Sequence, residues 1–395
     1  MGEPGVLSEL EKTVGGIMIV KIADNILSPL GLTTDENFNS ILAGESKLAV
    51  HQNVFGLPEA FCGSLFDRER LSKILAESIT DSADLSFLEQ LCVYSALQAL
   101  ENTGINPANP DVIFVISTTK GNVEYLSEDR MDKRSYLAYS ANRISRYFAN
   151  PNKPLVVSNA CISGVCAQIA AVRELLSGRY RYAIVIGCDV LSKFIVSGFQ
   201  SFKALSGEKC KPYDKNRSGL NLGEAAGTII LQSTENPIFE SWQYVGSSIH
   251  NDANHISGPS RTGEGSYRVL TDILKSIDKS SLAFVNAHGT ATAYNDEMES
   301  IAIHRVGLDD VPINGLKGVY GHTLGAAGII ETILSMKAID NSVVMPTRGY
   351  EEQGTFYALN ISNQKKETEK KAFIKILSGF GGSNAGIAYR KGGIG

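Results

Sequence analysis

The segment V-V-S-N-A-C-I-S-G-V, residues 156–165, places a cysteine between a short apolar run and a small-residue stretch that opens a helical pattern. Residues 155–157 predict a buried strand, and residues 164–176 predict a helix. A strand that passes directly into a helix is typical of α/β layers. This segment therefore indicates an α/β fold with Cys161 at the turn between the two elements.

The same alternation continues along the chain on both sides of this segment. Short β-branched runs bounded by Gly, Pro, Asn or Asp predict strands buried on both faces, at 17–22, 111–116, 182–187, 227–231, 282–285 and 373–377. Helical patterns occur at 85–100, 297–305 and 328–339. Residues 160–171 and 321–333 share a design, because each puts a small-residue loop with a reactive side chain before an apolar helix. We therefore expect two similar halves that join near residues 233–237.

Composition narrows the class of protein. The 395 residues are 43% hydrophobic and 20% charged, which is typical of a folded globular chain and excludes disorder for most of it. The net charge of −5 gives no overall field that would attract nucleic acid. No run of 18 apolar residues predicts a membrane span.

The six cysteines are scattered, with no C-x-x-C pair, so they indicate neither a disulfide framework nor a zinc site. A reducing, cytoplasmic location is expected. Residues 1–17 do not have the pattern of a signal peptide. We treat them as an unassigned N-terminal extension, with Met18 as a plausible natural start.

Cys161 is the first candidate for chemistry. A thiol at a helix start faces unsatisfied N–H groups and the positive end of the helix dipole, and both are expected to lower its pKa and favour the nucleophilic thiolate. The alternative at this point is an inert buried thiol, which is the commoner fate of a cytosolic cysteine.

Three further segments carry reactive or positioning groups. His288 follows a predicted strand in N-A-H-G-T-A-T, residues 286–292, where a core histidine is the alternative. Lys317 and His322 lie in K-G-V-Y-G-H-T-L-G-A-A-G, residues 317–328. The last strand ends in S-G-F-G-G-S-N, residues 378–384, whose backbone N–H groups can point at an oxyanion.

Taken together, these segments resemble the β-ketoacyl-acyl-carrier-protein synthases, or ketosynthases, of the thiolase-like condensing-enzyme family. The matching motifs are I-L-S-P-L-G at 26–31, A-C-x-S-G around Cys161, P-Y-D-K-N-R-S-G-L-N-L-G-E at 212–224, and the three segments above with Asp296 and Glu299. The resemblance covers about Met18 to the C-terminus.

The resemblance implies a fold of five layers, α-β-α-β-α, made of two similar halves. We place the halves at residues 18–235, with the nucleophile, and 236–395, with both histidines. It also implies a homodimer, with a heterodimer of sister ketosynthases as the alternative.

The implied reaction is a decarboxylative Claisen condensation in fatty-acid or polyketide-type elongation. By matching motif, Cys161 accepts the acyl chain, while His288 and His322 stabilise the enolate formed when malonyl carrier loses carbon dioxide. Lys317 and Glu331 would orient these groups. The N–H groups of Cys161 and Phe380 would form the oxyanion hole, with Phe380 also the gating aromatic.

The resemblance further implies that Thr290 and Thr292 bind the pantetheine arm of an acidic acyl carrier protein. No metal and no cofactor beyond that arm is expected. Docking of the carrier would use a basic rim, for which the candidates are Arg68, Arg70, Lys133, Arg134 and Lys203; a solvated surface accounts for these equally well.

Some positions depart from the family pattern. The usual opening I-T-G-x-G is I-A-D-N-I here, at residues 22–26, and Asn159, Ile162 and Ser378 replace other residues around the nucleophile. These departures favour a specialised polyene or polyketide pathway over a housekeeping role.

Four other interpretations fit these motifs less well. A non-catalytic chain-length-factor-like partner subunit would lack the cysteine. A degradative thiolase needs a second cysteine near the C-terminus, and none follows Cys210. The initiating condensing enzymes pair cysteine with histidine and asparagine, whereas this chain has a second histidine, His322. A zinc hydrolase built from His288, His322 and Glu331 lacks the usual ligand spacing.

Overall fold

The computed structural model describes residues 16–126, 132–236, 240–252, 254–255 and 258–392. Its large mixed sheet has two sets of five strands. The first set, in spatial order, is β1 (Met18–Leu27), β8 (Ala225–Thr234), β6 (Tyr182–Asp189), β4 (Val112–Ser117) and β5 (Leu155–Val157). The second is β9 (Trp242–Asn251), β15 (Ser383–Lys391), β14 (Ala372–Gly379), β10 (Leu282–Asn286) and β11 (Ile313–Asn314).

The two sets repeat one pattern of strand directions. In the first, β1 and β8 and then β8 and β6 pair antiparallel, while β6, β4 and β5 are parallel. In the second, β9 and β15 and then β15 and β14 pair antiparallel, while β14, β10 and β11 are parallel. The sets join because β1 also pairs with β9, at Val20–Gln243 and Lys21–Trp242, so the ladder runs through all ten strands.

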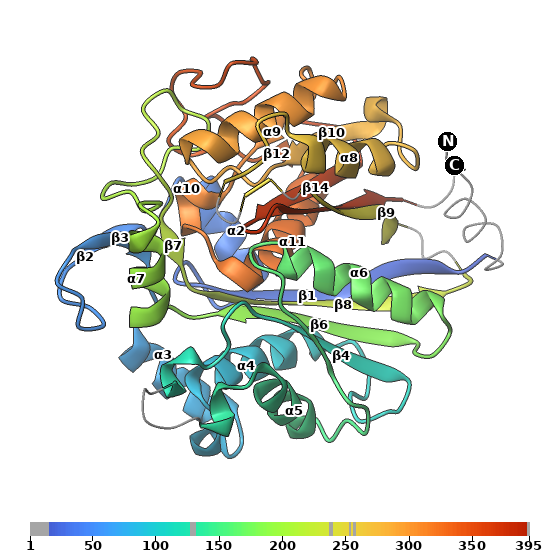
Figure 1. Ribbon diagram of the computed structural model, residues 1–395. Helices are drawn as coiled ribbons and strands as arrows, with labels where there is room; N and C mark the ends of the chain where they lie inside the picture. Colours follow the sequence, from blue (N-terminus) through green and yellow to red (C-terminus); the bar gives the residue numbers. More distant parts are fainter. Residues whose placement is uncertain (1–15, 127–131, 237–239, 253, 256–257, 393–395) are drawn as a thin grey trace.

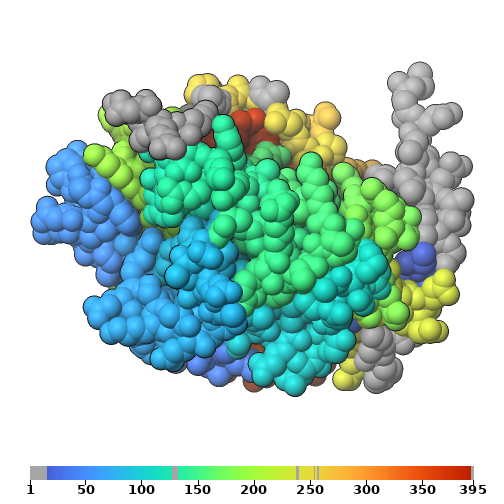
Figure 2. Space-filling model, turned by 90° about the horizontal axis from the view of Figure 1, so that it is seen from below, coloured from blue at the N-terminus to red at the C-terminus, as the bar shows by residue number. Residues whose placement is uncertain are grey.

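The helices form three layers around the two sets (Figure 1). The outer layer on the first set contains α3 (Arg68–Ser78), α4 (Phe87–Leu100) and α5 (Leu137–Tyr147). The middle layer contains α6 (Ser163–Leu176), α11 (Ala327–Asp340) and α2 (Thr34–Leu42). On the far side, α8 (Glu264–Ile273) covers β9 and β15, and α9 (Ala293–Arg305) packs against α8. Figure 2 shows the face of the first outer layer, which is covered mainly by residues from the first half of the chain. This arrangement confirms the five layers predicted from the sequence.

Shorter elements complete the fold. They are α7 (Lys193–Ser201), α10 (Lys317–Tyr320), a sheet of β2 (Ala49–His51), β3 (Phe61–Ser64) and β7 (Leu222–Gly223), and the pair β12 (Val343–Val344) and β13 (Lys366–Glu367). Single 3₁₀ turns lie at Ser82–Asp84, Val123–Tyr125, Lys133–Ser135, Lys279–Ser281 and Leu324–Ala326. None of the helices in the described ranges is long and apolar enough to cross a membrane.

The middle layer explains why α11 is apolar all round. It packs on α6 and on strands of both sets, β8 and β14, so no side of its first three turns faces solvent. The core around it combines residues from both halves, such as Ile26 and Val185 with Phe284 and Phe373. Burial of this shared core is therefore what holds the two halves together.

Most predicted elements lie where the sequence placed them, with shifted ends. The helix predicted at 85–100 begins at Phe87 because Ser86 caps it: Glu89 N–H donates to Ser86 Oγ at 3.2 Å, and Ser86 N–H donates to Glu89 Oε2 at 3.0 Å. The strand predicted at 17–22 runs on to Leu27, through an irregularity between Lys21 and Ala23. Residues 1–15 of the predicted extension lie outside the described residues. The division between 235 and 236 falls between β8 and β9 and stays a prediction.

Candidate active site

Cys161 lies in the turn that links β5 to α6. Ala160 has a positive φ of 44°, which turns the chain sharply before the helix. Ser163 Oγ closes the turn, because it accepts from Asn159 N–H at 2.8 Å and donates to the Ala160 carbonyl at 2.6 Å. The thiol is consequently held in one place at the base of a pocket, with 8% of the residue exposed.

The expected lowering of the Cys161 pKa is wrong. Burial raises the pKa of this thiol to about 11, and the charges of Lys317 and Lys120 and the Phe380 N–H lower it only in part. Desolvation penalises the thiolate more than the electropositive surroundings stabilise it. The resting thiol is therefore protonated at neutral pH, and its proton must leave as the sulfur attacks.

His288 lies on the loop after β10, and two carboxylates of α9 accept hydrogen bonds from the backbone of this loop. Glu299 accepts from His288 N–H at 2.7 Å and from Gly289 N–H at 2.8 Å, and Asp296 accepts from Thr290 N–H at 3.0 Å. Gly289 has a φ of 50°, which favours glycine at this sharp turn. Loop residues that satisfy buried carboxylates cannot move without leaving charges unpaired, so the position of His288 is fixed.

His322 follows α10 and is held by groups from the first half of the chain. The backbone N–H of His322 donates to the Asn221 carbonyl at 2.7 Å. In the same loop, Asp189 accepts from Gly325 N–H at 2.7 Å. Leu324 N–H donates to His322 Nδ1 at 3.2 Å. In the neutral ring the proton is therefore on Nε2, which makes Nε2–H a donor.

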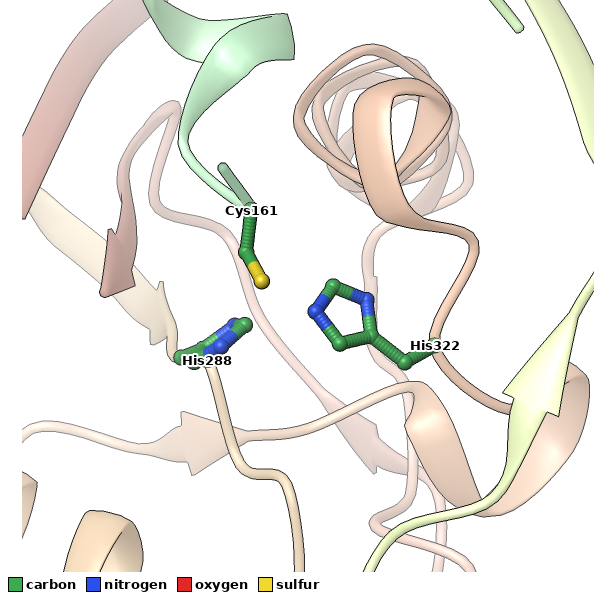
Figure 3. Close-up of side chains that lie close together, drawn as sticks. All are labelled: Cys161, His288 and His322. Carbon is green, nitrogen blue, oxygen red and sulfur yellow. The ribbon is translucent and has the colours of Figure 1, made fainter. Parts of the chain in front are cut away.

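The three side chains meet in one place, with the sulfur directed towards the two imidazole rings (Figure 3). The ligand-type atoms of Cys161, His288 and His322 all lie within 4.8 Å of one another, and the two rings meet edge to face at a centroid distance of 5.0 Å. Burial lowers the pKa of both histidines well below the usual value, and Lys317 lowers it further. Both rings are neutral at physiological pH.

Two imidazole nitrogens at this site are buried and have no hydrogen-bond partner among the described residues: His288 Nδ1 and His322 Nε2. Unpaired buried polar atoms are costly, and in native proteins they occur where a ligand completes them. Since both histidines line the pocket, these atoms are suited to bind an oxygen of a substrate.

Lys317 and Glu331 form a buried ion pair near the two histidines. Lys317 Nζ lies 2.9 Å from Glu331 Oε1, and both side chains are almost completely buried. A second lysine, Lys375 on β14, also contacts Glu331, through Oε2. Burial opposes ionisation of Glu331, but the two ammonium groups overcome it and hold the pKa of this carboxyl below its usual value.

The pocket above the thiol has a volume of about 550 Å³. Phe380 contributes its ring to the wall, where it packs against Phe199 and Phe202 at centroid distances of 5.7 and 5.5 Å. Thr290 and Thr292 also line it, with their hydroxyls 2.9 Å apart. The predicted nucleophile, histidines, gating aromatic and pantetheine-binding threonines thus come from both halves of the chain and line one cavity.

The predicted basic rim is only partly assembled at this pocket. Lys203 lines it. Arg68 is instead engaged with Glu224 at 2.9 Å and lies over the Phe87 ring, and Arg134 pairs with Asp132 at 2.6 Å. Lys133 lies over the Tyr139 ring, and Arg70 is exposed. Arg217, which was not among the predicted residues, lines the pocket as well.

Several groups that hold the site together were not predicted as site residues. They are Asp189, Tyr213, Asp296, Glu299 and Lys375. Lys375 had a usable signal, because a charged residue in the middle of the apolar run A-F-I-K-I-L is rarely buried unless it is paired. Which partner it would find could not be read from the sequence.

Among the described residues, Cys161, His288 and His322 are also the one group whose atoms are close enough to bind a metal ion together. Their environment disfavours a divalent cation, because Lys317 and Lys375 place two positive charges next to them. Glu331 cannot complete the zinc hydrolase site considered above, since both of its oxygens bind lysines.

Two family models match the chain. "Beta-ketoacyl synthase, N-terminal domain" matches residues 19–236, and "Beta-ketoacyl synthase, C-terminal domain" matches residues 243–351. A 3-oxoacyl-[acyl-carrier-protein] synthase 2 from Vibrio cholerae is 25% identical over 419 aligned positions, which cover 94% of this chain and 99% of the relative. Nodulation protein E from Rhizobium leguminosarum is 29% identical over 262 positions, 64% of this chain and 65% of the relative.

Solved structures share the whole fold. A β-ketoacyl synthase from Burkholderia phymatum superimposes with a TM-score of 0.84 at 22% identity, over 95% of this chain and 99% of that one. A ketosynthase from Xenorhabdus doucetiae, solved in complex with its chain length factor, gives 0.81 at 23% identity, over 95% and 98%. These similarities confirm the predicted thiolase-like fold.

Proposed function

The chain belongs to the β-ketoacyl synthase family, and from this premise we propose that it is an elongating 3-oxoacyl-acyl-carrier-protein synthase, a transferase that forms carbon–carbon bonds. It condenses malonyl carrier with an acyl chain held on Cys161. The observation that carries the assignment of residues is the single pocket in which the Cys161 sulfur faces two neutral imidazoles with unpartnered nitrogens.

In the first half-reaction, Cys161 Sγ attacks the carbonyl carbon of an acyl thioester on the carrier. The new C–S bond forms as the pantetheine thiol leaves, and that thiol takes up the proton lost by Cys161. The Phe380 N–H, which points at Sγ, supports a role for Phe380 and Cys161 N–H groups in stabilising the tetrahedral oxyanion. The Phe380 ring, packed on Phe199 and Phe202, would gate access to the thiol.

In the second half-reaction, the bond between the malonyl carboxylate and its methylene carbon breaks. Carbon dioxide leaves, and the electron pair is delocalised onto the thioester oxygen as an enolate. His322 Nε2–H and His288 would donate to this oxygen, in a buried site where such bonds are strong. The methylene carbon then attacks the acyl-Cys161 carbonyl, and the thiolate is released as the 3-oxoacyl product forms.

Lys317 and Glu331 would orient the histidines and set the potential around them, which agrees with their buried ion pair. Thr290 and Thr292, on the pocket wall, would bind the pantetheine arm. Substrates carried on that arm need no further cofactor, because loss of carbon dioxide supplies the carbanion. We place the protein in the cytoplasm.

The proposed partner is an acyl carrier protein. Lys203 at the pocket supports docking there. Arg70, Lys133 and Arg134 are the other proposed docking residues, of which Arg134 already pairs with Asp132. Arg68 is the weakest of the set because it already neutralises the buried Glu224. We propose a homodimer; the heterodimer with a sister subunit is the alternative, as in the ketosynthase from Xenorhabdus doucetiae.

A non-catalytic chain-length-factor role is not favoured. Such a subunit does not need a nucleophile, whereas Cys161 is held by a dedicated turn and faces both histidines. The departures at Asn159, Ile162 and Ser378 change the surroundings of the thiol and not the thiol itself. They support a specialised polyene or polyketide pathway rather than a different reaction.

Intact-mass measurements after incubation with acyl carrier proteins of several chain lengths, followed by malonyl carrier, test this function. Wild type is expected to gain an acyl mass and then to release an elongated 3-oxoacyl carrier. Cys161→Ala is expected to gain no acyl mass. His322→Ala is expected to acylate but to form product about 10²–10³-fold more slowly, because one enolate donor is lost. If wild type never acylates with any carrier-bound chain, the proposal is wrong.

A further inference from the structure

Lys375 is a buried cation that the reaction described above does not use. It lies in the middle of β14, between Ile374 and Ile376, and its side chain has no exposed surface. Lysine is almost never fully buried unless it is paired. Here it stands directly beside Asn286 in the neighbouring strand β10, two residues before His288.

The ammonium group of Lys375 has two oxygen partners. It contacts Glu331 Oε2, and it donates to the Ala287 carbonyl at 3.1 Å. Glu331 Oε1 is occupied by Lys317 at 2.9 Å, so one carboxylate lies between two ammonium groups. The cluster of Lys317, Lys375 and Glu331 therefore has two ammonium groups for one carboxylate, and its net charge is positive.

The second of these contacts leads to His288. The Ala287 carbonyl belongs to the residue before His288, and the opposite side of the same loop is held by Glu299, which accepts from His288 N–H. The positive charge of Lys375 also lowers the pKa of both His288 and His322. Burial lowers the pKa of Lys375 itself to about 8, with Glu331 opposing the change, so most of the lysine is charged at pH 7.

Several of the elements packed around the histidines contribute charged or titratable groups. These groups are Cys161 before α6; Asp189 at the end of β6; Tyr213 in the loop between α7 and β7; Asp296 and Glu299 of α9; Lys317 and Tyr320 of α10; Glu331 of α11; and Lys375 of β14. Asp189, Asp296 and Glu299 are each satisfied by backbone N–H groups, whereas Lys317 and Lys375 share one carboxylate.

We propose that Lys375 is a positioning residue for the decarboxylation step: its contact with the Ala287 carbonyl fixes His288, and its charge adds to burial and to Lys317 in favouring the neutral form of both imidazoles. A neutral imidazole donates to the developing enolate without pairing with the malonyl carboxylate. An imidazolium would instead form an ion pair with that carboxylate and stabilise the substrate more than the transition state. This proposal rests on the condensing function above.

The test uses Lys375→Met, which keeps most of the volume and removes the charge, with Lys391→Met as the matched control. Lys391 is a partly exposed lysine that pairs with Asp340, away from the pocket. Acylation of Cys161 is expected to persist in Lys375→Met. The kcat for decarboxylation of malonyl carrier is expected to fall roughly tenfold or more, with little change in KM, because an aligned donor and about one unit charge are lost. Lys391→Met is expected to match wild type in both.

The histidine pKa values give a readout that does not depend on activity. In ¹⁵N NMR titrations, the signals of His288 and His322 are expected to begin to titrate at higher pH in Lys375→Met than in wild type, because loss of a nearby cation favours the imidazolium. The signals are assigned by their loss in His288→Asn and His322→Asn. If Lys375→Met does not fold, Lys375→Gln, which is neutral but can still donate to the Ala287 carbonyl, carries the same expectation for both pKa values.

The proposal is overturned if decarboxylation stays within threefold of wild type in the folded variant. It is also overturned if the rate falls while neither histidine titration changes between pH 4.5 and 8. If wild type itself neither acylates nor decarboxylates, the condensing function fails, but the titrations still decide whether Lys375 controls the histidines.

Discussion

At the scale of single residues, two opposing effects act on the Cys161 thiol. Its place before α6 and the charges of Lys317 and Lys120 favour the thiolate, whereas burial favours the thiol. Burial prevails and raises the pKa to about 11. The site therefore protects its nucleophile from unwanted electrophiles until a substrate displaces water and accepts the proton.

This balance predicts how Cys161 reacts with iodoacetamide. Only the thiolate reacts, and its fraction rises tenfold for each pH unit below the pKa, so the alkylation rate is expected to rise about tenfold per unit from pH 6 to pH 9. The rate is followed by intact mass, with Cys161→Ala as the control, because the other five cysteines are also buried. A plateau below pH 8 would mean that the thiolate already exists at neutral pH, contrary to this account.

The three residues that meet at the site were predicted from the family resemblance, because each segment by itself left a purely structural role open. Cys161, His288 and His322 each lie in a short glycine-containing segment at the end of a predicted strand or before a predicted helix, and parallel strands end at one edge of a sheet. The resemblance implied that Glu331 supports Lys317, but the second contact of Glu331, with Lys375, was not predicted. It joins residues 44 positions apart, on α11 and β14, through their side chains alone.

At the scale of elements, the first turns of α6 and α11 make a close backbone contact, which positions Cys161 relative to His322. A Cβ on Gly164 would lie 2.9 Å from the Gly325 carbonyl oxygen and from Gly328 Cα, and a Cβ on Gly328 would lie 2.5 Å from Val165 N. Only glycine permits this approach, since the atoms it meets are backbone. A buried Gln168 side chain adds a bond across the same contact, to the Gly328 carbonyl at 2.9 Å.

Gly164→Ala is therefore expected to push the two helix starts apart and move Cys161 away from His322. We expect a loss of stability of about 1–3 kcal/mol, as for other overpacked cores, together with slower acylation. The matched control is Gly198→Ala in α7, where no atom lies within 4 Å of the added Cβ and alanine favours the helix by about 0.5–1 kcal/mol. Thermal unfolding and the acylation rate measure both variants; a Gly164→Ala protein as stable and as fast as wild type would contradict the close-contact argument.

The elements themselves were predicted better than their ends. Runs such as V-I-F-V-I at 112–116 are buried on both faces and have no polar residue to obscure them. The strand predicted at 17–22 ends too early because Asp24 and Asn25 interrupt the apolar pattern. In the structure, Thr34 Oγ1 donates to Asp24 at 2.7 Å and the Asn25 side chain donates to the Leu32 carbonyl at 3.2 Å. Side-chain bonds of this kind leave no periodic signal in the sequence.

At the scale of the whole molecule, the two halves share one core and one sheet. Residues from both contribute to the cluster around α6 and α11, and β1 pairs with β9. The similar halves were predicted from the matching loop-and-helix designs at 160–171 and 321–333. The β1–β9 pairing was not, because it involves only two residue pairs and neither strand shows from its pattern which edge it presents.

This sharing predicts that neither half folds by itself. Residues 18–235 produced alone would expose the face of α6 that packs on α11, a large apolar surface, and are expected to aggregate. Co-expression with residues 236–395 is expected to restore a soluble complex, and the intact chain is expected to unfold in one calorimetric transition. A stable, monomeric residues 18–235 with native circular dichroism would show that the shared core is dispensable.

The repeat of strand order and direction also bears on how such a chain arises. Two copies of one five-stranded unit, fused end to end, would give the order seen here, with β9 repeating β1 and β14 repeating β6. The central helix of the first copy starts after a thiol and that of the second after an imidazole. The two copies differ at the turn before this helix, so divergence of duplicated units, rather than addition of new ones, is enough to explain an asymmetric catalyst inside a nearly symmetric frame.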